Sequence, residues 1–146
     1  MMNYPGNEGR CLRLISKNNK FNQVLDLDWT SSKGIESIIR FLNKEKWLIN
    51  STSTNNKKLI HYFSERGVLT LVKYLVREDP DLILVKDKQG RTALFFASMN
   101  NKIEVVKYLI NKGSDAFTKD RMKKSSQDYA KEKNYQEICN ILDSKK

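Results

Sequence analysis

Short segments of this chain carry apolar residues at helical intervals, and the segments recur at a nearly constant spacing. Residues 71–76 (LVKYLV) return 34 positions later as residues 105–110 (VVKYLI), and residues 38–43 (IIRFLN) precede the first copy by 33 positions. Residues 137–142 (EICNIL) follow residues 104–109 by another 33 positions. In each copy the apolar residues face one side of a predicted helix and the charged residues face the other. The chain is therefore predicted to be an array of stacked copies of one small helical unit.

A second predicted helix precedes the segment at residues 105–110, and a tight turn precedes that helix. Residues 92–100 carry the helical pattern, and residues 87–91 (DKQGR) contain Gly90, which can take the left-handed backbone that a hairpin tip needs. The predicted unit is a hairpin, a helix, a turn and a second helix. A unit this short buries its apolar side chains only against its neighbours, so we expect an extended binding groove and not a closed pocket.

The unit between residues 87 and 115 resembles the ankyrin repeat, whose pattern is Asp-x-x-Gly-x-Thr-Pro-Leu-His-x-Ala, then Gly-His-x-Glu-Val-Val-x-x-Leu-Leu, then Gly-Ala-Asp. The matching positions are Asp87, Gly90, Thr92, Leu94, Ala97, Glu104, Val105, Val106, Leu109, Ile110, Gly113, Ser114 and Asp115. So many matches at fixed offsets are far more specific than a short motif. The resemblance implies an all-α ankyrin-repeat solenoid of helix-turn-helix units with projecting hairpin loops.

Departures from the family pattern lie mainly at turns. Ala93 replaces the family's Pro and Phe95 its His, while Asn100 and Asn101 stand where the turn between helices usually carries Gly. Because Asn tolerates positive φ, we expect this turn to survive.

The other copies depart further from the pattern. The copy at residues 53–86 has Asn56 at the hairpin glycine, and Pro80 is expected to end its second helix. The copy at residues 120–142 has Lys123 at that glycine and polar residues where an internal repeat is more apolar. These features are typical of a terminal capping repeat.

The predicted domain organisation is one ankyrin-repeat domain, residues 23–146, with about three repeats plus a C-terminal capping repeat. It follows an N-terminal extension of unknown structure, residues 1–22. In the first copy, Leu25, Leu27 and Trp29 are expected to form a degenerate first helix before Gly34 and a second helix at residues 36–43. The chain has no apolar run that could span a bilayer and no secretory signal pattern at its start, so a cytoplasmic location without membrane contact is expected.

No pattern for catalysis, for a cofactor or for a metal is found, and the protein is not predicted to be an enzyme. His61 is the only histidine, and no nucleophile or paired carboxylate is visibly arranged around it. By the resemblance, its ring nitrogens are expected to tie adjacent hairpins and helices together, and a catalytic or metal role is the alternative. Cys11 and Cys139 lie at opposite ends of the predicted solenoid. Two free thiols in a reducing compartment are therefore expected, with Cys139 in the core.

A net charge of +10, from 27 basic and 17 acidic residues, is the second informative feature. In the repeat register many cations fall on the hairpins, namely Lys57, Lys58, Lys86, Lys88, Arg91, Lys119, Arg121, Lys123 and Lys124. In ankyrin repeats the hairpin tips and the exposed ends of the first helices commonly contact the partner. A basic concave surface attracts an acidic partner and speeds the encounter, although the lysines could equally serve solubility alone.

We therefore expect one acidic protein partner, bound with 1:1 stoichiometry on the concave face of a chain that is monomeric when free. The predicted partner-binding residues are Lys57, Glu65, Arg66, Lys88, Arg91, Met99, Asn100, Arg121 and Lys124. Among them Met99 is a flexible apolar side chain on a polar rim, which suits either a partner's cavity or half-buried packing.

The favoured function is a non-catalytic protein-binding module that neutralises or inhibits its partner, as an immunity protein does to its cognate antibacterial toxin. A viral or parasite ankyrin protein that captures a host signalling factor is an alternative, and a partner that is activated would use the same face. A nucleic-acid-binding basic solenoid is a further alternative. It is disfavoured because Phe95, Phe96, Tyr74 and Tyr108 fall at packed positions and leave no stacking platform beside the cations.

Overall fold

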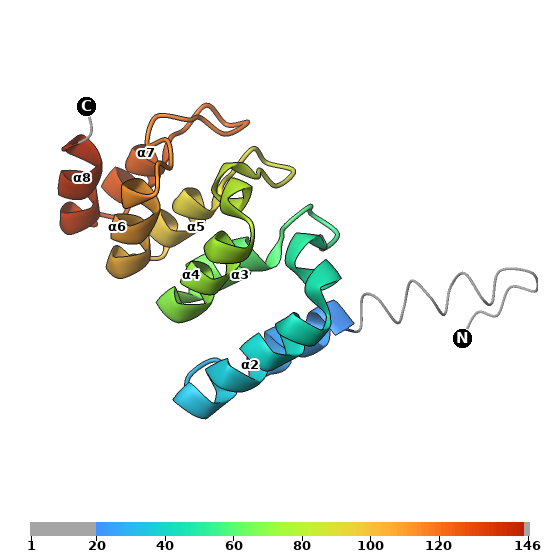
Figure 1. Ribbon diagram of the computed structural model, residues 1–146. Helices are drawn as coiled ribbons and strands as arrows, with labels where there is room; N and C mark the ends of the chain where they lie inside the picture. Colours follow the sequence, from blue (N-terminus) through green and yellow to red (C-terminus); the bar gives the residue numbers. More distant parts are fainter. Residues whose placement is uncertain (1–19, 145–146) are drawn as a thin grey trace, which may run out of the picture.

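The structure is a computed structural model that describes residues 20–144, and in this range it is built from helices (Figure 1). Residues 20–26 are helical, and they are followed by α2 (Ser32–Lys44), the 3₁₀ helix η1 (Lys46–Asn50), α3 (Leu59–Arg66), α4 (Leu69–Glu78), the 3₁₀ helix η2 (Pro80–Leu84), α5 (Ala93–Met99), α6 (Ile103–Asn111), α7 (Ser126–Glu132) and α8 (Gln136–Asp143). Extended pairing within the described range is limited to two isolated bridges, Thr52 with Lys58 and Lys119 with Ser125. The predicted all-α class is confirmed.

The helices pair, and the pairs stack into a solenoid (Figure 1). α3 packs on α5 and α5 on α7, which makes a layer of first helices, while α4, α6 and α8 form the layer of second helices. The hairpins between successive pairs project from the same side of the stack. They are joined to each other, because the Lys88 N–H donates to Asn55 O at 3.0 Å and the Arg121 N–H to Gln89 O at 2.9 Å.

A left-handed residue recurs at the same place in every hairpin and in every turn between paired helices from α3 onward. The hairpin residues are Asn56 (φ 56°), Gly90 (77°) and Lys123 (62°). The residues between the helices are Gly67 (75°), Asn101 (58°) and Asn134 (59°). The recurring turn conformation is therefore adopted by asparagine and lysine as well as by glycine. The prediction that asparagine preserves the turn is confirmed at Asn101.

One hydrophobic core runs through all the stacked pairs. The second helices contribute its buried members Ile38, Leu42, Leu71, Val72, Leu75, Val105, Val106, Leu109, Ile138, Cys139 and Leu142. These are apolar positions of the recurring segments, so the helical face that the sequence predicts is the buried face. The expected burial of Cys139 is confirmed.

Pro80 ends the helix before it, as predicted. α4 stops at Glu78, and Asp79 then caps η2 by accepting a hydrogen bond from the Asp81 N–H at 3.2 Å. The insertion that makes this repeat 34 residues long lies in this connection, outside the stacked helices.

The first repeat differs from the expectation in its boundaries. The first helix covers residues 20–26, so it begins before residue 23 and ends before Leu27 and Trp29, and its Phe21 is buried in the core. The second helix, α2, begins at Ser32 and not at residue 36, because Ser31 caps it by accepting from the Gly34 N–H at 3.0 Å. Residues 1–19, with Cys11 and most of the predicted extension, lie outside the described range.

Candidate functional site

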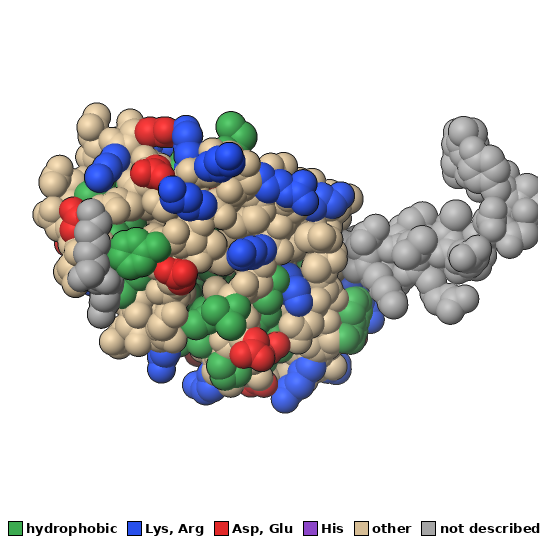
Figure 2. All heavy atoms as spheres, turned by 90° about the horizontal axis from the view of Figure 1, so that it is seen from above, with side chains coloured by type: hydrophobic (Ala, Val, Ile, Leu, Met, Phe, Trp, Pro, Cys, Tyr) green, Lys and Arg blue, Asp and Glu red, His purple; other side chains and the backbone are tan. Residues whose placement is uncertain are grey.

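Basic side chains are spread over the surface that the solenoid presents on its hairpin side. Figure 2 shows the molecule from above, where Lys and Arg outnumber Asp and Glu and some hydrophobic side chains are exposed among them. The surface predicted to bind a partner lies at the hairpins and at the adjoining ends of the first helices. Some of its residues form ion pairs or hydrogen bonds with other parts of the chain, and others form no ion pair with residues 20–144.

Lys57 and Lys124, at the bases of the first and third hairpins, are paired within their own repeats. Lys57 Nζ lies 3.3 Å from Glu65 Oε2, and Lys124 Nζ bonds in the same way to Glu132 Oε1. The Lys57 ammonium also lies over the ring of Tyr62, at 4.2 Å, and only 14% of its side chain is exposed. Hydrogen bonding to Glu132 raises the pKa of Lys124. These two lysines are therefore partly neutralised before any partner arrives.

Arg91 is the equivalent cation of the middle hairpin, and it pairs with the next repeat. Its own repeat has Met99 where the others have glutamate, and Arg91 Nε lies 3.4 Å from Asp120 Oδ2 instead. Arg91 also donates from a terminal nitrogen to the Tyr129 hydroxyl at 3.2 Å, and Tyr129 itself donates to Asp120 Oδ2. Arg91, Asp120 and Tyr129 thus bind the second hairpin to the last repeat.

Asp120 is the buried centre of this cluster, with no exposed side-chain surface. Burial opposes its ionisation, but hydrogen bonds from Tyr129, from the Lys124 N–H, from Arg91 and from the Met122 N–H outweigh burial and lower the pKa of the carboxyl. Burial and the contact with Asp120 raise the pKa of Tyr129. Asp120 is therefore a charged structural centre and has no free lone pair directed toward a partner.

Arg66 and Asn100 hold the ends of first helices. Arg66 donates to the Leu25 carbonyl oxygen at 2.8 Å, which links α3 to the first helix of the preceding repeat, residues 20–26. Asn100 donates from Nδ2 to Phe96 O at 2.8 Å. At the equivalent position of the last repeat, Lys133 reaches back to the Met99 carbonyl oxygen at 2.9 Å. Their side chains satisfy carbonyls at the ends of helices, which is a structural task.

The predicted residues Lys88 and Arg121 are exposed, and neither forms an ion pair with residues 20–144. The same holds for Lys86, Lys119 and Lys123. These five hairpin cations are called the tip cations below.

Three exposed apolar side chains beside the tip cations were not predicted. Leu84 is 61% exposed, Phe117 48% and Met122 65%. Leu84 and Phe117 are 33 positions apart and hold equivalent places before two successive hairpins. That spacing is visible in the sequence, but the exposure is not, because both side chains look like core residues by type.

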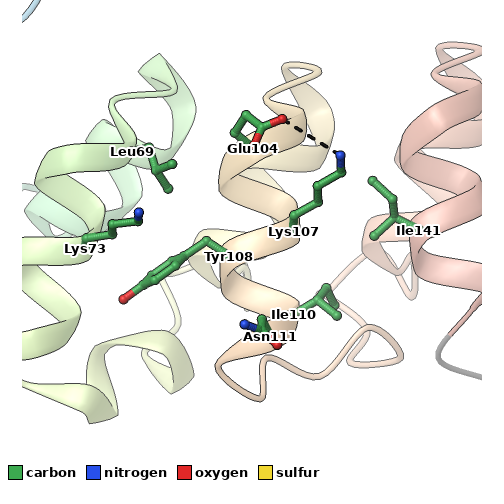
Figure 3. Close-up of a pocket in the computed structure, with 8 residues that line it drawn as sticks. All are labelled: Leu69, Lys73, Glu104, Lys107, Tyr108, Ile110, Asn111 and Ile141. Atoms are coloured by element: carbon green, nitrogen blue, oxygen red, sulfur yellow. Dashed lines mark ion pairs between the residues drawn. The ribbon is translucent and has the colours of Figure 1, made fainter.

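The face formed by the second helices holds a shallow groove of about 420 Å³ over α6 (Figure 3). Its lining includes Lys73, Tyr108, Lys107 and Ile141 from three successive second helices. Lys107 lies 3.9 Å from both Glu104 and Glu137, and Lys73 lies over the Tyr108 ring at 5.8 Å. The charges of this groove are thus more balanced than those of the hairpins.

His61 is buried and ties two repeats together. Its Nδ1 accepts from the Lys58 N–H at 2.9 Å, so Nε2 carries the hydrogen that is donated to the Val85 carbonyl oxygen at 3.0 Å. Both nitrogens are occupied, and within residues 20–144 no group of three or more His, Cys, Asp or Glu side chains is placed to hold a metal ion. In the same part of the chain, no helix has the length and apolar character needed to cross a membrane.

Comparison with known proteins identifies related sequences. Residues 27–120 and 81–145 match the sequence model of a family described as ankyrin repeats (3 copies). The serine/threonine-protein kinase VIK of Arabidopsis thaliana is 33% identical over 101 residues, which are 69% of this chain and 22% of the kinase. A putative ankyrin repeat protein of Rickettsia bellii is 26% identical over 117 residues, 75% of this chain and 17% of that protein. This chain therefore spans about a fifth of the length of these two relatives.

A relative of similar size is also found. Protein phosphatase 1 regulatory subunit 27 of Mus musculus is 28% identical over 113 residues, which are 77% of this chain and 73% of the subunit.

Proposed function

Because this chain belongs to the ankyrin-repeat family, whose repeats are protein-interaction modules, we propose that it is a non-catalytic protein that binds one acidic partner protein and neutralises it in a 1:1 complex. The observation that carries the proposal is the set of tip cations. They are exposed, they lie on neighbouring hairpins that are joined by backbone hydrogen bonds, and they have no ion pair among residues 20–144. Unneutralised cations on a rigid row supply the long-range attraction and the sign of charge that select an acidic partner.

The residues of the predicted site take different parts in this proposal. Lys57, Arg91 and Lys124 shape the surface through their internal pairs, and Lys88 and Arg121 contact the partner's acidic groups. Met99 interrupts the row of glutamates at the ends of the first helices, so it offers a small apolar contact in the middle of the concave face.

Neutralisation is proposed because a chain of this size can cover one partner surface with one face. The relative of similar length is named as a regulatory subunit of protein phosphatase 1, which supports a role in controlling another protein's activity. An immunity protein that blocks a cognate antibacterial toxin in the cytoplasm fits this proposal, and capture of a host signalling factor by a viral or parasite protein fits it as the alternative.

The test begins with capture of partners from the source cell by the purified chain, after nuclease treatment and at low and high salt. A single stoichiometric acidic protein supports the proposal, and its activity should then fall to zero as the chain is added to a 1:1 ratio. An increase in the partner's activity would contradict neutralisation. Recovery of nucleic acid alone, lost on nuclease treatment, would replace the proposal with the basic nucleic-acid-binding solenoid.

A matched pair of variants then locates the surface. Lys88→Glu with Arg121→Glu changes the charge of the hairpins, and Lys33→Glu with Arg40→Glu makes the same change in total charge on α2. We expect the hairpin variant to weaken partner binding by about a hundredfold at low salt, and the α2 variant by about threefold or less. Equal losses would show that total charge, and not the hairpin surface, attracts the partner.

A further inference from the structure

The segments that lead into two hairpins present side chains of the same types to solvent in the same order. Along the second hairpin the exposed residues are Leu84, Lys86 and Lys88, and along the third they are Phe117, Lys119 and Arg121. Leu84 closes η2, and Lys88, Phe117 and Arg121 lie in turns, but along both segments each exposed residue alternates with a more buried one. Each segment therefore displays one apolar side chain followed by two cations. The two triplets are 33 positions apart and lie on neighbouring repeats.

Hydrogen bonds hold the residues that alternate with the exposed ones. The Val85 carbonyl oxygen accepts from His61, and the Asp87 carboxylate accepts from the N–H groups of Gln89 and Arg91. In the third hairpin the buried Asp120 carboxylate does the same for Met122 and Lys124. The outward side chains are therefore presented on a backbone that is already ordered.

The same positions in the first hairpin carry Asn50, Thr52 and Thr54, which are neither apolar nor charged. The pattern is thus confined to two adjacent repeats. Leu84 and Phe117 remain 61% and 48% exposed beside four cations that form no ion pair with residues 20–144. An apolar anchor surrounded by charge is more typical of a binding surface than of a solubilising one.

We propose that Leu84, Lys86, Lys88, Phe117, Lys119 and Arg121, named here the hairpin-entry surface, dock an acidic amphipathic helix of the partner. This inference rests on the proposed function, because it names the part of the acidic partner that is recognised. Adjacent repeats are separated by the packing distance of helices, about 8–10 Å. In a helix, residues seven apart lie on one face and about 10.5 Å apart, which is close to this separation of adjacent repeats.

An extended peptide fits this spacing less well. Its side chains on one face are about 6.6 Å apart, or about 13 Å for every second one, so one apolar residue at a time would meet its anchor. The docked helix therefore places apolar residues i and i+7 on Leu84 and Phe117 and acidic residues i+1, i+4 and i+8 along one flank. That flank lies against Lys86 and Lys119, with Lys88 and Arg121 beyond them.

The test uses the full chain and a fluorescent, end-capped peptide of about 18 residues, with Leu at i and i+7, Glu at i+1, i+4 and i+8, and Ala and Gln elsewhere. Anisotropy titrations at low salt are expected to show 1:1 binding that the double variant Leu84→Ser with Phe117→Ser weakens by about tenfold. Lys119→Glu with Arg121→Glu should weaken it at least as much, and Lys33→Glu with Arg40→Glu by about threefold or less. A peptide with Lys for Glu should not bind.

The outcomes separate this inference from the proposed function. Binding of the peptide that is insensitive to Leu84→Ser with Phe117→Ser would overturn the docking surface. So would an acidic partner whose affinity those two changes leave intact, although the proposed function would stand. Tighter binding to vesicles containing phosphatidylserine, or to single-stranded DNA, than to the peptide would also overturn it, because the occupant would then be a lipid surface or a nucleic acid. Unchanged melting temperatures of the variants are required, and both apolar positions are exposed enough to expect them.

Discussion

The imidazole of His61 donates from Nε2 to the carbonyl oxygen of Val85, 3.0 Å away and 24 residues further along the chain. This bond joins the first helix of one repeat to the segment that leads into the next hairpin. The equivalent position of the next repeat carries Phe95, whose ring instead packs edge-on against Tyr129 with the ring centres 6.1 Å apart. The same position of the repeat thus links adjacent repeats by a hydrogen bond where it carries His61 and by aromatic packing where it carries Phe95.

His61 should make the stability of the protein depend on pH near neutrality. Burial lowers the pKa of its imidazole, so the unfolded chain binds a proton more readily than the folded one. The stability that neutral His61 supplies is complete above the ordinary pKa of about 6.5 and is lost as the pH falls below it. Chemical denaturation from pH 8 to about pH 5.5 should show this decrease.

The control for His61 is His61→Phe, which copies the residue of the next repeat. At pH 8 it should cost about 1–3 kcal/mol, because the Lys58 N–H and the Val85 carbonyl lose their partners. Its stability should also be flat over the same pH range, since the chain has one histidine. An equal slope in the variant would assign the titration to another group.

Asp120→Asn should destabilise the protein by about 2–3 kcal/mol. Asparagine at this position can still accept from the Met122 and Lys124 N–H groups, but its amide nitrogen would face Arg91 and the Tyr129 hydroxyl, which donate to Oδ2 in the native protein. The free energy of unfolding by urea measures the loss.

Asp87→Asn is the matched control, because Asp87 holds the same place in the preceding hairpin. Its Oδ1 accepts from the N–H groups of Gln89 and Arg91, and asparagine preserves both bonds. A cost of less than about 0.5 kcal/mol is expected. Equal costs for the two changes would show that the cluster of Arg91, Asp120 and Tyr129 adds nothing to the hairpin's own hydrogen bonds.

Gly34→Ala should destabilise the first repeat even though it adds a better helix former inside α2. A Cβ at residue 34 would lie 1.8 Å from the Asp28 carbonyl oxygen, so the chain before the helix must move. The expected cost is about 2 kcal/mol or more, against a gain in helix propensity of about 1 kcal/mol. Ser37→Ala, at an exposed position of the same helix, should change stability by about 0.5 kcal/mol or less. Stabilisation by Gly34→Ala would show that the two segments do not pack as described.

Lys123→Gly should stabilise the protein. Lys123 has φ of 62°, a conformation that costs a residue with a Cβ about 1–2 kcal/mol, while glycine adds a smaller entropic cost on folding. A net gain of about 0.5–1 kcal/mol should raise the melting temperature by a few degrees. Asn56→Gly is the comparison at the first hairpin, and it should gain less because asparagine tolerates this region. A loss of stability at residue 123 would mean that the lysine side chain supports the hairpin.

Much of the fold is predictable because the repeat is local. The spacing of 33 and 34 residues locates the helices, and α5 begins and ends within a residue of the predicted range. The start of α2 is less predictable, because it depends on the cap at Ser31 and on the close approach of Gly34 to Asp28. A degenerate repeat at the end of an array has fewer family residues to set its register.

The candidate surface is predictable in outline and not in detail. The register places the cations on the hairpins, but it does not show that Lys57 and Lys124 pair inside their repeats or that Leu84 and Phe117 stay exposed. Of the aromatic residues expected at packed positions, Phe95, Phe96 and Tyr74 are buried, but Tyr108 is only partly buried. Phe117 is an exposed aromatic ring near the tip cations. Exposure depends on what the next repeat covers, which residue type does not reveal.

The sequence by itself determined the repeat, the helical faces and the left-handed backbone at Gly90 and at the Asn100–Asn101 turn, because each follows from spacing within one unit and from the limits of φ. Only the tertiary structure decided which charges remain free. Arg91 has Met99 in its own repeat where Lys57 has Glu65, and it finds Asp120 only because stacking brings the next hairpin within 3.4 Å. An ion pair depends on distance in space, and in a solenoid that distance is set between units and not within them.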